Sequence, residues 1–288
     1  LDSIYPLRRH HDNFFGTPAY LHPYLYYISE KYSGTEIDLL DLTDPINFLH
    51  HEAVISFPEE AVMVTMSETH LYVALDNDEI RIYDISTPES PALVHTFTGL
   101  TSLKKIGVVG AKTWYTTLIQ LNGAAMRWYN VEDPTTPTDK GIALNITGSN
   151  EDFTVYGDMV MKLRIDGGTR TLNIYHVGGG SADMVTDGYV NLPRQAHNLA
   201  CRWPYIYISS DYDGLMVVDA SDSMNPAYVG YVDQDDLTSN FLAADSTRLF
   251  ATTDYGGFTV FDIDSQTIPV AHGRSRVINY PRECAQLG

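Results

Sequence analysis

Val217-Val218-Asp219-Ala220-Ser221 is the clearest copy of a phrase that the chain repeats six times. The aligned Asp positions are 41, 84, 130, 176, 219 and 262, so successive copies lie 43 or 46 residues apart. A fixed period of this length is typical of solenoids, propellers and other repeat arrays. The other copies are Leu39-Leu40-Asp41-Leu42, Ile82-Tyr83-Asp84-Ile85, Trp128-Tyr129-Asn130-Val131, Ile174-Tyr175-His176-Val177 and Val260-Phe261-Asp262-Ile263.

The fifth repeat predicts four short antiparallel strands, at 197–201, 205–209, 215–220 and 227–232. Asp211-Tyr212-Asp213-Gly214 predicts a tight turn, because Gly adopts positive φ freely and Asp bonds to nearby backbone. The third strand is almost wholly apolar, which is typical of a strand buried on both faces. The spacing leaves no room for a long helix.

A single four-stranded sheet cannot bury both of its faces, and radial stacking of such sheets solves this problem. We therefore predict an all-β β-propeller of six four-stranded blades in one domain, 1–288, because a β-sandwich would not need a regular period. The predicted repeats are 14–57, 58–99, 100–148, 149–193, 194–234 and 235–276. Segments 1–13 and 277–288 are expected to close the ring with a terminal strand, which removes exposed edges; a seventh blade built from both ends is the alternative.

The third strand and its loop resemble the LVIVD repeat, most closely at Val217-Val218-Asp219-Ala220-Ser221 and Ile82-Tyr83-Asp84-Ile85-Ser86-Thr87-Pro88. Ala196-His197-Asn198-Leu199-Ala200 also resembles the start of that family's innermost strand. The resemblance covers roughly residues 17–275. The third repeat departs from it with Asn130, and the fourth departs with His176 and Gly178-Gly179-Gly180.

This resemblance implies a secreted or cell-surface bacterial or archaeal propeller, and it transfers no catalytic residue. Because the chain begins at Leu1 rather than Met, we expect that a leader has been removed. The repeated aspartates are predicted to cap their own loops by accepting hydrogen bonds from backbone amides. These loop caps are Asp41, Asp84, Asp219 and Asp262.

The strongly negative net charge of the chain limits the classes of partner that it can bind. Of the 288 residues, 18 are Lys or Arg and 37 are Asp or Glu, for a net charge of −19. Such a field repels phosphate backbones, so we expect no nucleic-acid partner.

No apolar run reaches the ~18 residues that a membrane span needs, so we expect no membrane insertion. Cys201 and Cys284 make no disulfide framework, and whether they pair stays open.

Recognised catalytic motifs are missing: the sequence has no Cys-x-x-Cys pair, no phosphate-binding glycine loop and no Gly-x-Ser-x-Gly. Acidic pairs occur at Asp76 and Asp78 and at Asp211 and Asp213. Hard cations need several converging oxygen ligands, whereas Asp is also an ordinary turn residue. We therefore predict no cofactor. The alternative is that one of these acidic pairs binds a metal ion, which would then be Ca²⁺.

One polar constellation stands out at the mouth of the expected central channel. Aligning the second strands of the repeats places one residue per blade at this mouth, namely Thr17, Val62, Lys105, Asn150, His197 and Asn240, with Glu60 close by. We take the polar residues of this ring as a candidate ligand site. Glu151, Asp152 and Gln195 lie close by in sequence, and a hydrated channel is the alternative interpretation. The candidate residues are His197, Asn150, Asn240, Lys105, Thr17 and Glu60.

These observations favour a non-enzymatic, secreted or cell-surface scaffold that binds a protein or glycan partner through one propeller face. The first alternative is a metal-assisted hydrolase or lyase at the channel mouth, with His197 as ligand or base. The second alternative is a structural subunit of a larger extracellular assembly. We leave the question of enzymatic activity open and favour a protein without it.

Overall fold

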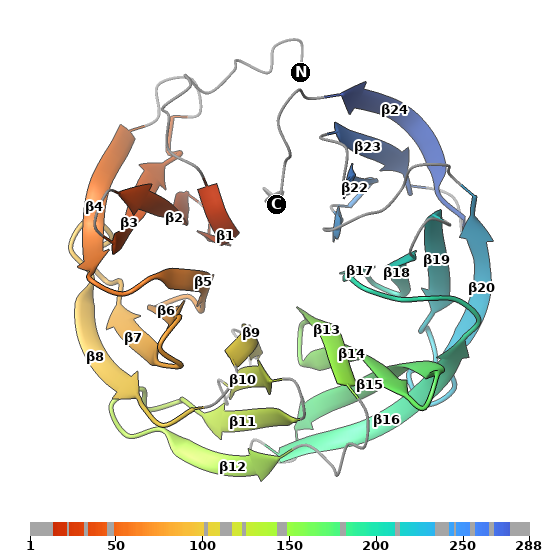
Figure 1. Ribbon diagram of the computed structural model, residues 1–288, viewed down its shortest axis with the longest axis horizontal. Helices are drawn as coiled ribbons and strands as arrows, with labels where there is room; N and C mark the ends of the chain where they lie inside the picture. The colour runs from red at the N-terminus through yellow and green to blue at the C-terminus, as the bar shows by residue number, and fades with distance from the viewer. Residues whose placement is uncertain are drawn as a thin grey trace.

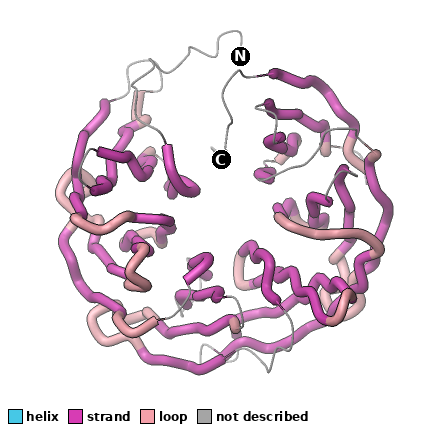
Figure 2. The backbone as a smooth tube through the Cα atoms, in the orientation of Figure 1, coloured by secondary structure: helices cyan, strands magenta, loops and turns pink. Residues whose placement is uncertain are grey.

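The described strands form six four-stranded antiparallel sheets, each built from four consecutive strands. In the computed structural model the sheets stand in a ring, with the first strand of each nearest the centre and the fourth outermost (Figure 1). Strands and loops make up the described chain (Figure 2). The predicted all-β propeller with four-stranded blades is therefore confirmed. The described residues are 14–21, 23–31, 34–44, 49–100, 103–109, 117–122, 125–142, 149–178, 183–210, 214–233, 242–244, 246–253, 257–264 and 268–276.

The blades are numbered in chain order. Blade 1 holds β1 (Phe14–Leu21), β2 (Tyr24–Lys31), β3 (Gly34–Asp41) and β4 (Leu49–Phe57). Blade 2 holds β5 (Ala61–Met66), β6 (His70–Leu75), β7 (Ile80–Asp84) and β8 (Ala92–Phe97). Blade 3 holds β9 (Leu103–Val109), β10 (Thr117–Asn122), β11 (Met126–Asn130) and β12 (Thr138–Ile142).

The second half of the ring follows the same order. Blade 4 holds β13 (Ser149–Tyr156), β14 (Met159–Asp166), β15 (Thr169–Gly178) and β16 (Asp183–Leu192). Blade 5 holds β17 (Leu199–Arg202), β18 (Tyr205–Ser210), β19 (Gly214–Asp219) and β20 (Ala227–Val232). Blade 6 holds β21 (Leu242–Ala244), β22 (Arg248–Thr253), β23 (Gly257–Asp262) and β24 (Val270–Arg276).

All of these strands fall inside the predicted repeat boundaries. The third strand of blade 5 is buried on both faces as predicted, and Gly214 opens it with φ +103°. One boundary was wrong: the innermost strand of blade 5 begins at Leu199, so His197 lies in the linker before it. The predicted closure segments 1–13 and 277–288 lie outside the described residues.

Apolar clusters between neighbouring blades hold the ring together. Because side chains alternate across a strand, each central strand packs one set of residues on the preceding blade and the other set on the following blade. In blade 4, Met161 and Leu163 pack on blade 5, whereas Val160 and Tyr175 pack on blade 3. Each blade is thus stabilised mainly by its two neighbours.

The antiparallel strands place the connecting loops at two opposite ends of the sheets. We call one side the linker face; it carries the linkers between blades, such as 58–60 and 193–198, and hairpins such as 76–79. We call the other side the cap face; it carries the loops between third and fourth strands, such as 85–91 and 220–226. The two faces present different chemistry.

Candidate functional site

On the cap face, the repeated aspartates cap their loops as predicted. In each case the Asp Oδ1 accepts a hydrogen bond from the backbone amide two residues later. The four bonds are Thr43 to Asp41 at 2.9 Å, Ser86 to Asp84 at 2.7 Å, Ser221 to Asp219 at 2.8 Å and Asp264 to Asp262 at 3.2 Å. Hydrogen bonds from the Thr43 side chain and amide lower the pKa of Asp41. The Ser86 amide lowers the pKa of Asp84 in the same way. These carboxylates are therefore structural.

Two blades vary this cap. Asn130 Oδ1 in blade 3 accepts the Glu132 amide at 2.9 Å, so Asn replaces Asp without loss of the bond. In blade 4, His176 instead contacts the Asp187 carboxylate of the neighbouring strand β16 through Nδ1. Blade 4 has therefore exchanged a loop cap for a contact between strands.

On the linker face, Lys105 lies in a bond network that joins three blades. Its Nζ donates to Asp152 Oδ1 at 2.5 Å and lies 5.4 Å from the centroid of the Phe153 ring. The other oxygen, Asp152 Oδ2, accepts the Leu199 amide at 3.0 Å. The Asp152 side chain is only 8% exposed. This carboxylate ties the innermost strands of blades 3, 4 and 5 together.

The remaining channel-mouth candidates are only partly brought together. The His197 amide donates to Ser209 O at 3.1 Å, which extends the pairing with β18, and the His197 side chain is half-buried. Glu60 is exposed in the linker before β5. Thr17 lies in β1 and Asn150 in β13, but their side chains are outside the described set, as is the whole of Asn240.

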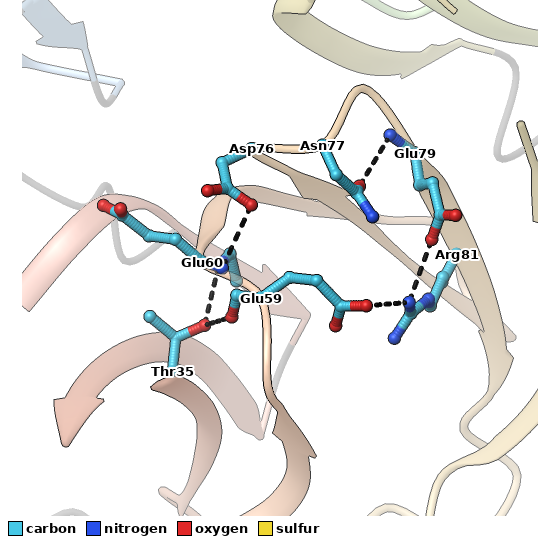
Figure 3. Close-up of polar contacts among 8 residues, drawn as sticks. Thr35, Glu59, Glu60, Asp76, Asn77, Glu79 and Arg81 are labelled. Carbon is cyan, nitrogen blue, oxygen red and sulfur yellow. Dashed lines mark hydrogen bonds and ion pairs between the residues drawn. The ribbon is translucent and has the colours of Figure 1, made fainter. Parts of the chain in front are cut away.

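A charged cluster joins blades 1 and 2 on the same face (Figure 3). Arg81 Nη2 donates to Glu59 Oε1 and to Glu79 Oε2, each at 2.9 Å, and the bond from Arg81 lowers the pKa of Glu59. Asp76 Oδ1 accepts the Glu60 amide at 3.2 Å. Glu60 and Asp76 are both exposed. The result is an ordered acidic surface with one central cation.

Blade 1 supplies the other half of this junction. Thr35 Oγ1 donates to Glu59 O at 3.1 Å and accepts the Ala61 amide at 2.6 Å. One hydroxyl therefore fixes the linker that carries Glu59 and Glu60 against the start of β3. The position of the acidic surface is set by backbone bonds as well as by the ion pairs.

The predicted metal ligands serve other purposes where they are described. Asp78, at φ +62°, accepts the Leu103 amide of blade 3 through Oδ1 at 2.8 Å, and Asp76 bonds the Glu60 amide. Asp211 and Asp213 lie outside the described residues. Within the described part of the chain, no group of three or more His, Cys, Asp or Glu side chains is placed to hold a metal ion.

Sequence reasoning missed two buried ionisable side chains, Lys162 and Asp38. Lys162 in β14 is fully buried, and burial together with the nearby Arg164 lowers its pKa to about 7. Asp38 in β3, also buried, accepts the Ala53 amide at 2.7 Å and lies 3.4 Å from His50 Nε2. The repeat alignment carried a signal for Lys162, because it stands where blade 5 has Ile208 and blade 2 has Val73.

Two further observations bear on chemistry. Cys201 is a free thiol, and burial raises its pKa to about 12, which keeps it protonated and a poor nucleophile. Cys284 lies outside the described residues. Among the residues that the structure describes, no helix is long and apolar enough to span a bilayer.

Comparison with known proteins supports the repeat and the fold. The LVIVD repeat model matches residues 60–99 and 193–234, which hold blades 2 and 5, so the chain carries LVIVD repeats within a β-propeller. No curated protein matches the sequence.

Solved structures match at low identity. A Lactobacillus plantarum protein is 12% identical with a TM-score of 0.72, covering 92% of this chain and 85% of that one. The periplasmic gluconolactonase of Pseudomonas aeruginosa is 11% identical with a TM-score of 0.70, covering 91% and 85%. BamB from Moraxella catarrhalis is 11% identical with a TM-score of 0.57, covering 94% and 77%. At such identity these likenesses establish the fold alone.

Proposed function

We propose that this LVIVD-repeat propeller is a non-enzymatic scaffold that binds a basic segment of a protein partner on its linker face, at the junction of blades 1 and 2. The observation that carries the proposal is the ordered acidic surface around Arg81, with Glu59 and Glu79 fixed by ion pairs and Glu60 and Asp76 exposed. Placement outside the cell is part of the same proposal and rests on the family resemblance.

Preorganisation is the physical reason to favour this surface. Glu59, Glu79 and the Glu60 backbone are already held, so a partner orders few side chains on binding. The net charge of −19 attracts a cationic partner over long range and speeds its encounter. A basic segment with spaced Lys or Arg side chains fits this chemistry better than a neutral glycan does.

The test compares two variants with the same change in net charge. Basic peptides selected from a display library on the wild-type protein are measured by biolayer interferometry against Glu60→Lys and against Glu89→Lys. Glu60 lies on the linker face and Glu89 on the cap face, and both are exposed. We expect Glu60→Lys to weaken binding by about tenfold or more and Glu89→Lys to have little effect.

Equal losses in both variants would mean that only overall charge matters, and no loss in either would place the contact elsewhere. A glycan array probed in parallel identifies the other partner class. Glycan binding that Glu60→Lys leaves intact would contradict the proposal.

A second candidate is a hydrolase or lyase at the channel mouth. The half-buried His197 favours this candidate, because it lies just before β17, whose Leu199 amide binds Asp152. A propeller of similar fold is a gluconolactonase. Hydrolysis of gluconolactone, followed by pH-stat with and without added divalent metal, tests it directly. Turnover that His197→Ala abolishes would favour this candidate over the scaffold.

A third candidate is a structural subunit. The large exposed apolar residues include Leu49 on β4, Leu93 on β8, Tyr189 on β16 and Val270 on β24, and these strands belong to four different blades around the ring (Figure 1). Scattered residues of this kind need no partner. Light scattering of the purified protein tests this candidate, since a stable assembly would appear as a mass well above one chain.

A further inference from the structure

The interface between blades 3 and 4 contains two buried hydrogen-bond donors without an acceptor. Lys162 Nζ in β14 and Trp128 Nε1 in β11 are both buried, and neither has a hydrogen-bond partner within the described part of the structure. Leaving a buried donor unsatisfied destabilises the folded state, and the cost is larger when the donor is charged. Most buried polar side-chain atoms in native structures have a hydrogen-bond partner, so two orphan donors in one interface call for an explanation.

Strand register places both donors on facing surfaces. Lys162 pairs with Phe153, which belongs to the same apolar cluster as Trp128, Ile119 and Val109 of blade 3. Cross-strand partners point to the same side of a sheet, so Lys162 faces blade 3.

The two rows of residues also meet. Gly107, Ile119 and Trp128 form one row across blade 3, and Phe153, Lys162 and Asn173 form the opposite row in blade 4. A Cβ added at Gly107 would lie 2.7 Å from Phe153 Cε2, so the rows are in contact at their inner ends. Lys162 and Trp128 therefore belong to facing rows of one interface.

The charges around Lys162 are already paired. Lys105 of blade 3 binds Asp152 at 2.5 Å, and Arg164 on the face of β14 that carries Lys162 binds Asp166 at 2.5 Å. Tyr175 faces the interface from β15, and burial raises the pKa of its phenol, which keeps it neutral. The two carboxylates named here, Asp152 and Asp166, are therefore already engaged by Lys105 and Arg164.

We propose that Lys162 and Trp128 form a proton-coupled site for a small monovalent anion, such as chloride, between blades 3 and 4. Two N–H donors that point into an apolar interface need an acceptor, and an anion also balances the charge of a protonated lysine. The nearby Arg164 adds positive potential. Proton and anion enter together, so the interface is neutral in both states.

Linkage predicts how this site responds to pH. Because the folded pKa of Lys162 is about 7, the amine takes up its proton as the pH falls through neutrality. Only the protonated amine attracts chloride strongly. Chloride should therefore stabilise the protein at about pH 6 and have little effect at about pH 9.

The first test measures Tm in chloride and in gluconate at equal ionic strength. Wild type is expected to gain several degrees from chloride at about pH 6 and almost nothing at about pH 9. Lys162→Met should abolish this chloride effect, and Trp128→Phe, which keeps an aromatic ring but removes the N–H, should reduce it. An equal chloride effect in wild type and Lys162→Met would overturn the proposal.

The second test needs no variant and so does not depend on whether a variant folds. Crystals of the wild-type protein in bromide at about pH 6 should show an anomalous peak beside Lys162 Nζ, and the peak should weaken at about pH 9. Ordered water without an anomalous signal at that position would overturn the anion assignment. A peak that does not change with pH would overturn the coupling to the proton.

Discussion

Blade 5 and blade 4 are neighbours with the same four-strand plan, yet they use it differently. Blade 5 follows the repeat: Asp219 caps its loop, and Ile208 fills the face toward blade 4. Blade 4 departs from the repeat at both of these positions, with His176 for the Asp and Lys162 for the Ile. The LVIVD model matches the part of the chain that holds blade 5 but not the part that holds blade 4.

The difference between blades 4 and 5 indicates which positions of a repeat protein are informative about function. Positions that follow the repeat are explained by packing and loop caps, so they carry little information about activity. A position that breaks the repeat at a cost in stability is more informative, because such violations tend to occur at functional sites. Lys162 is such a position, because it is buried without a hydrogen-bond partner among the described residues. The His176–Asp187 contact also departs from the repeat.

The largest expected effect is a gain in stability from Lys162→Met. The folded pKa of about 7 lies below the ordinary 10.5, so the unfolded chain binds the proton more readily and the wild type is destabilised below pH 10.5. Below neutrality this penalty is full, on the order of 5 kcal/mol. The variant should gain about that much in urea unfolding at neutral pH in low-chloride buffer.

The pH profile provides the control for this first prediction. Wild type should gain stability between about pH 7 and pH 9, whereas Lys162→Met should lack that gain. The matched change in blade 5, Ile208→Met, should leave the profile unchanged. A variant with wild-type stability and slope would show that Lys162 is solvated in the folded state.

Next in size is the loss expected from Asp152→Ala. The change removes the acceptor of both Lys105 Nζ and the Leu199 amide in a side chain that is 8% exposed. We expect a loss of about 2–3 kcal/mol in the free energy of unfolding. Asp166→Ala, in a side chain that is 44% exposed, is the control and should cost less than about 1 kcal/mol.

The junction between the two blades is also sensitive to a single methyl group. A Cβ at Gly188 of blade 4 would lie 2.4 Å from Met224 O in the loop of blade 5, and backbone atoms cannot move aside easily. Gly188→Ala should cost about 2 kcal/mol. The aligned Gly230→Ala in blade 5 meets the flexible Ile268 side chain at 3.2 Å and should cost clearly less in the same thermal melt.

The smallest predicted effect concerns the loop cap. Asp219→Ala removes the bond to the Ser221 amide and should cost about 1 kcal/mol, while Asp219→Asn should keep most of the stability because Asn130 makes the same bond in blade 3. Urea midpoints of the three proteins check this order. An Asn variant as unstable as the Ala variant would show that the carboxylate charge, rather than the bond, carries the effect.

Sequence reasoning reached the fold and the loop caps because both depend on local signals. One repeat is enough to see the strand pattern and the turn residues. The same repeat also contains the Asp that binds an amide two residues later. The candidate site was predicted only in part. The sequence indicated Lys105 as a candidate, with Asp152 nearby, but it did not indicate that the Asp152 carboxylate binds both Lys105 and the Leu199 amide. The His197 boundary was misplaced by two residues because the linker extends the strand pairing through a backbone bond.

The sequence by itself determined the architecture of this protein, since a period of 43 or 46 residues with an apolar third strand admits few folds other than a propeller. Only the tertiary structure decided which polar residues are partnered across blades, because those partners lie far apart in the sequence. Asp152 meets Lys105 and Leu199 each 47 residues away, and Asp78 meets Leu103 25 residues away. Lys162 is distinctive for the same reason: its burial is created by blade 3.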